Sequence, residues 1–384
     1  VRHQEWTKTE YKGNQNIHYI ETRKEELCCP ECKSRKIIRS GSIYRDIRSV
    51  PVGHRETILR MKVQRIECKE CGCIRQEKIH FVTGKRSYTN KFARYVVDLS
   101  RIGTIKDVAQ FLNISWDTVK DIQKRYLQRH YGNPDLSKLE YIGIDVFAVR
   151  KGHVYKTIVV DLLTGQVVYV GDGKGADALD KFWKKVRKAK TRIKAVATDL
   201  SAAFISSVKE NAPEATLVFD HFHVVKLMND TLDKLRRQAY NQEADLMKRK
   251  VLKGARWLLL CNGEDIYDSC HRNRLENALE MNAPLMKGYY LKESLREIWM
   301  QVTKEQAEQV LKDWVKQAQD SKVPLLQKYA MTLLAHRSGI LPWYEHHIST
   351  GKIEGINNKI KTMKRQAYGY RDEKFLELKI LYLH

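Results

Sequence analysis

The segment Tyr141–Gly175, YIGIDVFAVRKGHVYKTIVVDLLTGQVVYVGDGKG, decides the fold of this chain. Stretches rich in Val and Ile alternate in it with glycine-containing turns at Gly152–His153 and Thr164–Gly165, a pattern typical of consecutive antiparallel strands. We therefore expect three strands in succession: Ile142–Arg150, Tyr155–Leu162 and Gln166–Val170.

Asp145 lies inside the apolar run of the first of these strands. A carboxylate is costly to bury unless it is paired or bound to a metal ion. For a single residue, a solvent-facing Asp at a strand end or a satisfied buried Asp would be the simpler interpretation. Further carboxylates in comparable settings, Asp199 and Glu354, favour a shared site instead.

The segments that follow continue the same fold. We expect a helix, a buried strand, a second helix, another strand and a third helix: Asp177–Ala189, Ile193–Leu200, Ser201–Asn211, Thr216–Asp220 and the stretch from His223 onward. This order is that of a ribonuclease-H-like α/β core, a mixed five-stranded sheet with flanking helices. The first and fourth strands are neighbours in that fold, so Asp145 and Asp199 should meet.

Residues 231–340 lack strand patterning and predict an all-helical insertion in this core. The helices expected there are Leu232–Leu252, Glu276–Met281, Glu293–Val302 and Glu305–Gln319.

The segment Ser349–Arg371 predicts an amphipathic helix. Its apolar face carries Ile353, Ile356, Ile360 and Met363. Glu354, Asn358, Lys361 and Arg365 share another face, which offers a carboxylate beside groups suited to phosphate. Taken alone, that face could equally be a solvated charged surface.

Six of the eight cysteines lie in residues 28–73. The pairs Cys29–Cys32 and Cys68–Cys71 are CxxC knuckles, which can hold one structural Zn²⁺ in a tetrahedral site. Cys28 and Cys73 remain as spare thiols, so the choice of ligands stays open. The basic, alternating stretch between the knuckles predicts a hairpin. Clustered CxxC pairs without a secretory signal indicate a reducing compartment.

Residues 104–130 show a helix–turn–helix pattern. Asn113 turns the chain between a first helix at Ile105–Phe111 and a second at Trp116–Arg129. The basic side chains expected to contact DNA on the second helix are Lys120, Lys124, Arg125 and Arg129. A plain helical hairpin in a bundle is the alternative, but the adjacent basic zinc module favours DNA recognition.

The net charge of the chain also indicates DNA as a partner. Lys and Arg outnumber Asp and Glu by 70 to 46, and residues 1–140 contain 29 basic and 17 acidic residues. A positive charge spread over every domain is the expected footprint of a nucleic-acid-binding protein. An anionic membrane surface is the rival partner, but neither a basic amphipathic anchor nor a run of about 18 apolar residues supports it.

Several motifs together resemble the DDE transposases of bacterial insertion sequences, and the chain is most similar to the third ISL family. The motifs that carry this resemblance are CPEC at Cys29–Cys32, RIECKEC at Arg65–Cys71, IGIDVFA at Ile142–Ala148, TDLSAAF at Thr198–Phe204, FDHFHVVKLMN at Phe219–Asn229 and KIEGINNKIKTMKRQAYGYR at Lys352–Arg371. The resemblance covers nearly the whole chain and implies a zinc-binding N-terminus, DNA-end recognition and a ribonuclease-H-like catalytic core.

The resemblance also implies how the site works. Asp145, Asp199 and Glu354 would hold two Mg²⁺ (or Mn²⁺) ions, with Asp145 bridging them, for cleavage and strand transfer. Asp220 and His223 are possible auxiliary residues; the simpler interpretation is a capping Asp and a packed His. Joining two DNA ends calls for a homodimer on double-stranded DNA. The alternatives are a DNA-binding regulator and a repair or resolving nuclease on the same fold.

The domain boundaries expected from these patterns divide the chain into five parts. They are 1–83 for the zinc module, 84–138 for the helix–turn–helix, 139–230 for the first part of the core, 231–340 for the insertion and 341–384 for the final helices with Glu354.

Overall fold

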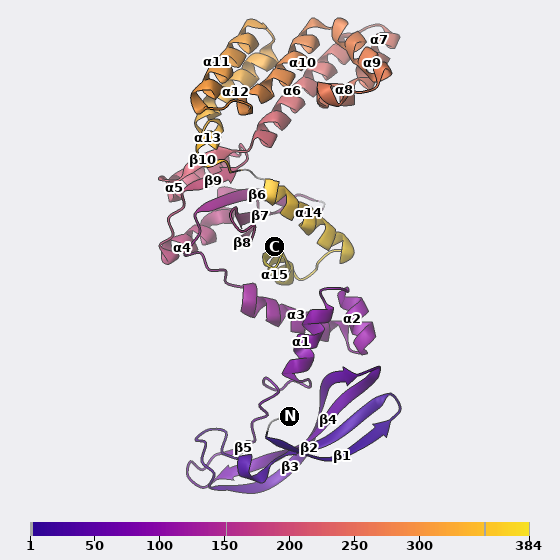
Figure 1. Cartoon of the computed structure of the whole chain (residues 1–384), viewed down its shortest axis with the longest axis vertical. Coiled ribbons are helices and arrows are strands. Elements are labelled where there is room, and N and C mark those ends of the chain that lie inside the picture. Colours follow the sequence, from indigo (N-terminus) through magenta and orange to yellow (C-terminus); the bar gives the residue numbers. More distant parts are fainter. Residues whose placement is uncertain (1–2, 151, 349–350, 384) are drawn as a thin grey trace. The chain divides into compact units, whose positions relative to one another are not determined.

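The computed structural model describes residues 3–150, 152–348 and 351–383. The chain forms two compact units, Val1–Gly132 and Asn133–His384 (Figure 1). Strands β1 to β5 and helices α1 to α3 belong to the first unit, and the later elements belong to the second. None of the described helices is long and apolar enough to cross a membrane.

The first unit begins with a five-stranded sheet of order β1-β2-β4-β3, in which β5 also pairs with β4. Its strands are β1 Gln4–Lys12, β2 Gln15–Thr22, β3 Ile37–Val52, β4 Arg55–Cys68 and β5 Ile74–Gln76. Strands β3 and β4 pair antiparallel from Ile37–Cys68 to Val52–Arg55, which confirms the hairpin expected between the cysteine knuckles. The β1–β2 hairpin is not among the elements expected from the sequence.

Three helices complete the first unit: α1 Asn90–Leu99, α2 Ile105–Leu112 and α3 Trp116–Tyr131. Thr104 caps α2 and forms a reciprocal capping box with Asp107, while Ser115 caps α3. Asn113 ends α2 with a left-handed φ of 49°, a conformation that Asn tolerates better than most residues. The expected helix–turn–helix is therefore present, and α1 packs on it as an additional helix through buried Phe92 and Val96.

A small polar network joins the helix–turn–helix to the sheet of the same unit. Arg48 forms an ion pair with Glu56, and its Nη2 also donates to the carbonyl of Leu112 at 2.9 Å. Glu56 accepts a second hydrogen bond from Asn113 Nδ2 at 2.9 Å. The hydrogen bond with Arg48 holds the pKa of Glu56 at about 2. The turn of the helix–turn–helix is thus fixed by a charged contact to β3 and β4.

The second unit is built on a mixed five-stranded sheet of order β10-β9-β6-β7-β8. Its strands are β6 Tyr141–Arg150, β7 Val154–Asp161, β8 Val167–Asp172, β9 Ala195–Thr198 and β10 Thr216–Phe219. Strand β6 pairs antiparallel with β7 and parallel with β9, as expected for a ribonuclease-H-like core. This confirms the fold class.

Side chains alternate across β6, so its two faces have different neighbours. Ile142 and Ile144 share a buried cluster with Phe182 and Trp183 of α4 (Asp180–Ala189) and Phe204 of α5 (Ala202–Asn211). Trp183 Nε1 donates to Ser207 Oγ at 2.8 Å, which links the two helices. Gly143 and Asp145 therefore face the opposite side of the sheet, where the last part of the chain packs.

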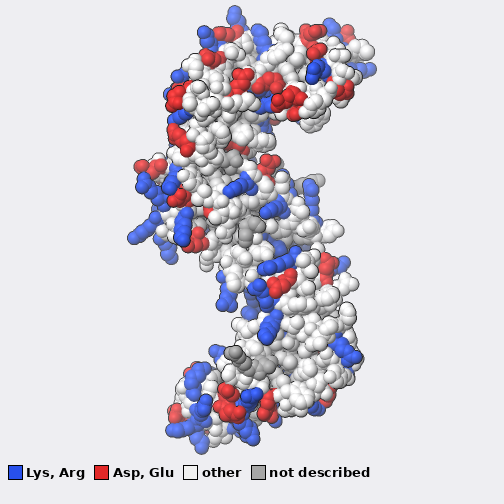
Figure 2. Space-filling view, viewed as in Figure 1, with Lys and Arg blue, Asp and Glu red and all other residues white. Residues whose placement is uncertain are grey.

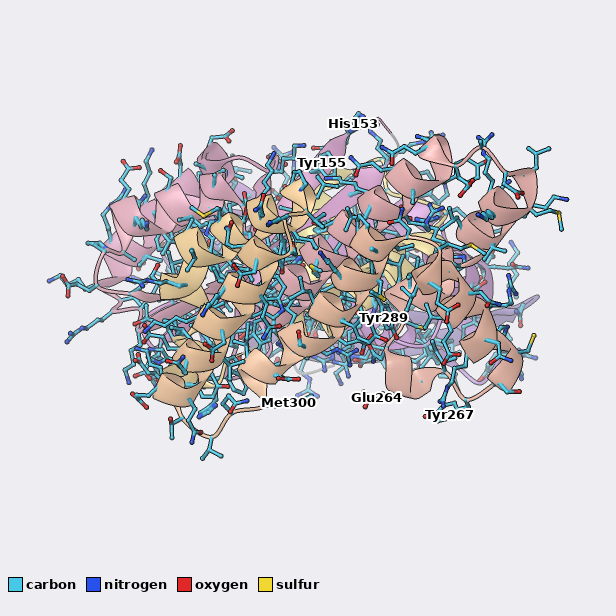
Figure 3. All side chains as sticks on the ribbon, turned by 90° about the horizontal axis from the view of Figure 1, so that it is seen from above. His153, Tyr155, Glu264, Tyr267, Tyr289 and Met300 are labelled. Carbon is cyan, nitrogen blue, oxygen red and sulfur yellow. The ribbon has the colours of Figure 1, made fainter. Side chains whose placement is uncertain are left out.

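The helical insertion contains seven α-helices within the described residues: α6 His221–Gln242, α7 Leu246–Gly254, α8 Arg256–Leu260, α9 Ser269–Glu280, α10 Ala283–Leu295, α11 Lys304–Asp320 and α12 Pro324–Ile340. The helix expected at Leu232–Leu252 is broken, because α6 ends at Gln242 and Asp245 caps α7. The helix expected at Glu293–Val302 is the end of α10 followed by a 3-10 turn. Tyr267 and Met300 project outward from the insertion (Figure 3), with exposed fractions of 88% and 70%.

The insertion is anchored on the edge strand β10. A Cβ added at Gly339 of α12 would lie 2.3 Å from the ring of Phe219, so glycine permits this close approach of helix and strand. Buried Tyr329 donates from its hydroxyl to the carbonyl of Val224 at 2.9 Å. These contacts join α12 to the beginning of α6 and return the chain to the sheet.

The chain ends with α13 Trp343–His346, α14 Gly351–Gln366 and α15 Glu373–Leu381. Lys156 of β7 is only 1% exposed, and its Nζ contacts Asp172 of β8 and Glu377 of α15. This buried cation with two carboxylates fixes α15 against the sheet. Helix α14 packs beside β6 (Figure 1).

Candidate active site and metal centres

Three aspartates fall at neighbouring positions across three adjacent parallel strands. Gly143 of β6 pairs with Ala197 of β9, so the register places Asp145 opposite Asp199, two residues further along each strand. Phe219 of β10 pairs with Thr198 of β9, so the next residues, Asp220 and Asp199, lie side by side in the register. Strand pairing alone therefore gathers three carboxylates at one end of this part of the sheet.

Asp145 is held by two hydrogen bonds. Its Oδ1 accepts from the backbone N–H of Val146 at 2.7 Å, and its Oδ2 accepts from Asn357 Nδ2 at 2.7 Å. Burial raises the pKa of Asp145, and the negative charge of Asp199 raises it further, whereas the nearby His223 lowers it. This balance shows that Asp199 and His223 both lie close enough to Asp145 to act on its charge.

Helix α14 approaches this face of β6 closely. A Cβ added at Gly143 would lie 2.2 Å from Cδ1 of Ile353, so only glycine leaves room for the helix. Lys352 Nζ donates to the carbonyls of Leu162 and Leu163, at 2.6 and 2.9 Å. Lys364 Nζ donates to the carbonyl of Ala148 at 2.7 Å. Both lysines clamp α14 onto the sheet.

Glu354 lies on α14 three residues before Asn357, which contacts Asp145. Residues three apart on a helix are neighbours on its surface, so Glu354 belongs to the same region as Asp145. Its side chain is exposed, as are those of Asn358, Lys361 and Arg365. Those three side chains thus form the solvent face expected from the sequence.

Asn357 is the residue that the sequence interpretation missed. It is only 8% exposed and lies among Ile353, Ile356 and Ile360 on the buried face of α14. The helical spacing could have identified Asn357. It lies four residues after Ile353, so its amide interrupts the apolar face of the helix.

The two possible auxiliary residues have different environments. Asp220 is 7% exposed and caps α6, accepting a hydrogen bond from the N–H of Phe222 at 3.2 Å. His223 is partly exposed, and its charge acts on Asp145. Asp220 thus caps α6, which is compatible with either interpretation, and His223 lies near Asp145.

These residues fit a divalent cation. Asp145 accepts a hydrogen bond from Asn357, the strand register places Asp199 opposite Asp145, and Glu354 lies one turn before Asn357 on α14. Hard cations prefer the oxygen ligands that such side chains offer. Within residues 3–150, 152–348 and 351–383, the buried Oδ1 of Asn357 has no hydrogen-bond partner. A hydrated cation would satisfy that oxygen and the clustered negative charge together.

The four predicted zinc ligands converge in the first unit. The Sγ atoms of Cys29, Cys32, Cys68 and Cys71 all lie within 4.8 Å of one another. Each knuckle turns at the residue after its second cysteine, where Lys33 and Gly72 have φ values of 65° and 70°. Matching turns present both thiol pairs to one point, which fits the tetrahedral site of a structural zinc ion.

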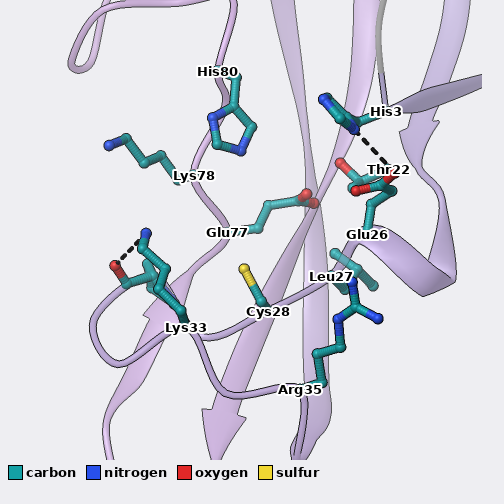
Figure 4. Close-up of a pocket in the computed structure, with 11 residues that line it drawn as sticks. His3, Thr22, Glu26, Leu27, Cys28, Lys33, Arg35, Glu77, Lys78 and His80 are labelled. Carbon is teal, nitrogen blue, oxygen red and sulfur yellow. Dashed lines mark hydrogen bonds and ion pairs between the residues drawn. The ribbon is translucent and has the colours of Figure 1, made fainter.

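The two remaining cysteines of the cluster differ. Cys73 Sγ lies 3.3 Å from Cys29 Sγ, so it borders the cluster. Cys28 points instead into a separate cavity of about 320 Å³, lined also by His3, Glu77 and His80 (Figure 4). The geometry therefore separates Cys28 from the metal centre and leaves Cys73 next to it.

The basic residues of α3 are not equivalent. Arg129 is exposed, whereas Arg125 donates to the hydroxyl of Tyr88 at 3.0 Å and pairs with Asp121. Lys120 lies over the ring of Trp116, and Lys124 is partly exposed. Lys and Arg side chains are frequent on the surface of the first unit (Figure 2).

Three family matches cover most of the sequence. Residues 25–71 match the zinc-finger of transposase IS204/IS1001/IS1096/IS1165, and residues 77–127 match the helix-turn-helix domain of transposase family ISL3. Residues 142–380, more than half of the chain, match a family described as transposase. The chain belongs to transposase family ISL3.

Curated relatives of this ISL3 transposase align with nearly its whole length. The transposase for insertion sequence element IS1001 of Bordetella parapertussis is 33% identical over 365 residues, covering 94% of this chain and 90% of that protein. The transposase for IS1557 of Mycobacterium tuberculosis (strain H37Rv) is 28% identical over 360 residues, covering 88% and 80%. The Drosophila P element transposase strand transfer complex aligns with a TM-score of 0.38 and 11% identity over 78% of this chain and 92% of that chain, too little for a structural conclusion.

The matches confirm the expected identity. The protein is a DDE-type transposase, with a zinc ribbon and a helix–turn–helix ahead of its catalytic core. The zinc-finger match contains all four clustered cysteines and ends at Cys71, and the transposase match contains Asp145, Asp199 and Glu354. The family assignment replaces the two alternatives, a DNA-binding regulator and a repair nuclease.

Proposed function

We propose that this ISL3 transposase binds the terminal inverted repeats of its insertion sequence and cleaves and joins DNA at Asp145, Asp199 and Glu354. The hydrogen bond from Asn357 to Asp145 is the observation that carries the site, because it brings together residues 212 positions apart. That contact places the helix of Glu354 against the strand of Asp145. Asp199 is supported by the strand register, and Glu354 by its position one turn from Asn357.

Recognition of the DNA ends is assigned to residues 1–138. Helix α3 enters the major groove, with Lys120, Lys124, Arg125 and Arg129 contacting phosphates and bases. Asn358, Lys361 and Arg365 contact the DNA backbone beside the catalytic carboxylates. Cys29, Cys32, Cys68 and Cys71 hold one Zn²⁺ that stabilises this part of the chain, since four thiolates leave no open position for chemistry.

Asp145, Asp199 and Glu354 would hold two divalent ions, Mg²⁺ or Mn²⁺, in the catalytic site. When bound, such ions activate the attacking hydroxyl and stabilise the charge of the phosphoryl group and the leaving oxygen. A water oxygen attacks phosphorus at the transposon end, and the bond to the 3′ oxygen breaks and releases a 3′-OH. That hydroxyl then attacks a target phosphodiester, so one bond forms for each bond broken.

The residues of the chain have distinct tasks in these steps. Asp145, Asp199 and Glu354 supply the negative oxygens that hold the ions in place. His223 lies close enough to bias the charge of Asp145, and Asp220 fixes the start of α6 on which His223 stands. Both are therefore auxiliary groups. A homodimer, in the bacterial cytoplasm at the nucleoid, would bring the two ends together.

The test is a strand-transfer assay on labelled transposon-end duplexes with Mg²⁺. The variants Asp145→Asn, Asp199→Asn and Glu354→Gln keep the side-chain shape and remove one charge each. Cleavage and strand transfer should fall at least 10³-fold, about 4 kcal/mol of barrier, whereas end binding in a gel-shift assay should persist.

Asp161→Asn is the matched control, because Asp161 accepts hydrogen bonds from Leu163 N and Thr164 Oγ1 and serves the turn after β7. It should retain cleavage. Normal cleavage by Glu354→Gln, or an equal loss in Asp161→Asn, would show that the carboxylates are wrongly assigned.

A further inference from the structure

Asn357 has one hydrogen-bonding group engaged and one left over. Its Nδ2 donates to Asp145 Oδ2 at 2.7 Å. Its Oδ1 is buried and has no partner among the residues that the structure describes. A buried polar atom without a partner costs about 1–3 kcal/mol. We therefore expect Oδ1 to have a hydrogen-bond partner when the protein is active.

The orientation of the amide is determined by its neighbour. If Oδ1 and Nδ2 were exchanged, the amide oxygen would face the oxygen of an ionised carboxylate, with no hydrogen between them. The donor therefore faces Asp145, and Oδ1 is the atom that remains. Oδ1 lies only about 2 Å from Nδ2 of the same amide group, and Nδ2 contacts the carboxylate of Asp145. A hydrogen-bond partner of Oδ1 must therefore also lie beside Asp145.

We propose that Asn357 is a positioning residue of the metal site. Its Nδ2 orients Asp145, and its Oδ1 accepts a hydrogen bond from water in the hydration shell of the ion that Asp145 binds. The proposal rests on the metal-dependent function given above. It explains why an amide interrupts the apolar stripe of α14, where a leucine would pack without leaving a polar atom unsatisfied.

A purely structural Asn357 would serve only to attach α14 to β6. Helix α14 already has other attachments to the sheet, namely the lysine clamps of Lys352 and Lys364 and the packing of Ile353 on Gly143. The two explanations differ in what they predict for metal binding. Only the positioning role ties Asn357 to the affinity for the ion.

The experiment is a titration of zinc-loaded, full-length protein with Mn²⁺ by calorimetry, which requires neither DNA nor activity. Asn357→Ala should weaken Mn²⁺ binding about 10- to 100-fold, the usual effect of removing a group that orients a metal ligand. Asn357→Asp keeps an acceptor oxygen and should bind Mn²⁺ more tightly than Asn357→Ala. Thr362→Ala, an exposed change on the same helix, is the control and should bind like the parent protein.

Thermal unfolding without metal and gel shift on end DNA verify that each variant is folded. Asp145→Asn separates this inference from the proposed function. If Asp145→Asn loses Mn²⁺ binding and Asn357→Ala does not, the positioning role is wrong and the catalytic site stands. If Asp145→Asn binds Mn²⁺ normally, the metal site itself is wrongly placed. Equal binding by Asn357→Ala and Asn357→Asp would overturn the role of Oδ1.

Discussion

Gly143 of β6 lies directly beneath Ile353 of α14, so that a Cβ at position 143 would be 2.2 Å from Ile353 Cδ1. The next residue on α14 is Glu354, and two residues beyond Gly143 on β6 is Asp145. The absence of one side chain therefore sets the spacing between the helix and the strand that carry these two carboxylates.

Replacing Gly143 by Ala should force Ile353 to move. Overpacking of this kind costs about 1–3 kcal/mol, and the displaced helix should slow DNA cleavage more than end binding. Ile353→Val removes Cδ1, so the double variant Gly143→Ala/Ile353→Val should recover part of both losses, which a double-mutant cycle measures. Gly355→Ala on the same helix is the control, because nothing lies within 4 Å of the added Cβ. Strict additivity of the two changes would contradict the contact.

Zinc content should depend on the cysteines to different degrees. Cys68→Ser removes a buried ligand, and the bound zinc should fall from one ion per chain to none, with loss of stability in the first unit. Cys28→Ser, on the side of the Figure 4 cavity, should retain one zinc ion. Elemental analysis of the purified variants measures both. A zinc-free Cys28→Ser protein would show that the ligand set is wrong.

The stability of the first unit should depend on pH through Glu56. Its pKa in the folded protein is about 2, below the ordinary value of 4.5. A carboxyl with a depressed pKa stabilises the folded state above its unfolded pKa, so this contribution is lost as the pH falls from about 4.5 towards 2. The shift corresponds to roughly 3 kcal/mol of unfolding free energy.

Glu56→Gln should remove that part of the pH dependence and lower the unfolding temperature near neutrality. Denaturation curves of the parent and the variant between pH 2 and 7 would converge at the acid end. Curves that remain parallel over the whole range would argue against an ionised Glu56 in the Arg48 contact.

DNA binding should distinguish Arg129 from Arg125. Arg129→Ala should weaken binding of end DNA and lower the slope of log K against log salt by about 0.9, the value for one lost phosphate contact. Arg125→Ala also loses the hydrogen bond to Tyr88, so it should reduce thermal stability as well. Salt titrations of the two variants against the same duplex test this. An unchanged slope for Arg129→Ala would exclude a phosphate contact there.

Sequence patterns predicted the sheet well, because consecutive strands with alternating faces leave few possible registers. They located the apolar face of α14 correctly at Ile353, Ile356, Ile360 and Met363, all of which are buried. They did not separate Asn357 from Asn358. Both are polar, and only the packing of α14 on β6 decides which of the two is buried.

The helical insertion was harder to predict for a different physical reason. Helix α12 buries Leu326, Tyr329, Ala330 and Leu333, but Met331 is also apolar and is 58% exposed. A helix with apolar residues on several faces has no clear 3.6-residue period, so its pattern does not reveal its limits. The sequence also does not distinguish the lysines of α14 from one another. Lys352 and Lys364 donate hydrogen bonds to backbone carbonyls, whereas Lys361 faces solvent.

The position of α14 after the insertion has a consequence during synthesis. The first unit ends at Gly132, whereas Glu354 is reached only 222 residues later. A chain interrupted anywhere in between would contain the complete zinc ribbon and helix–turn–helix but no third carboxylate. On the proposed division of labour, such a fragment would occupy a transposon end without cutting it. A ribosome that stops early would thereby produce an antagonist of the full-length enzyme from the same gene.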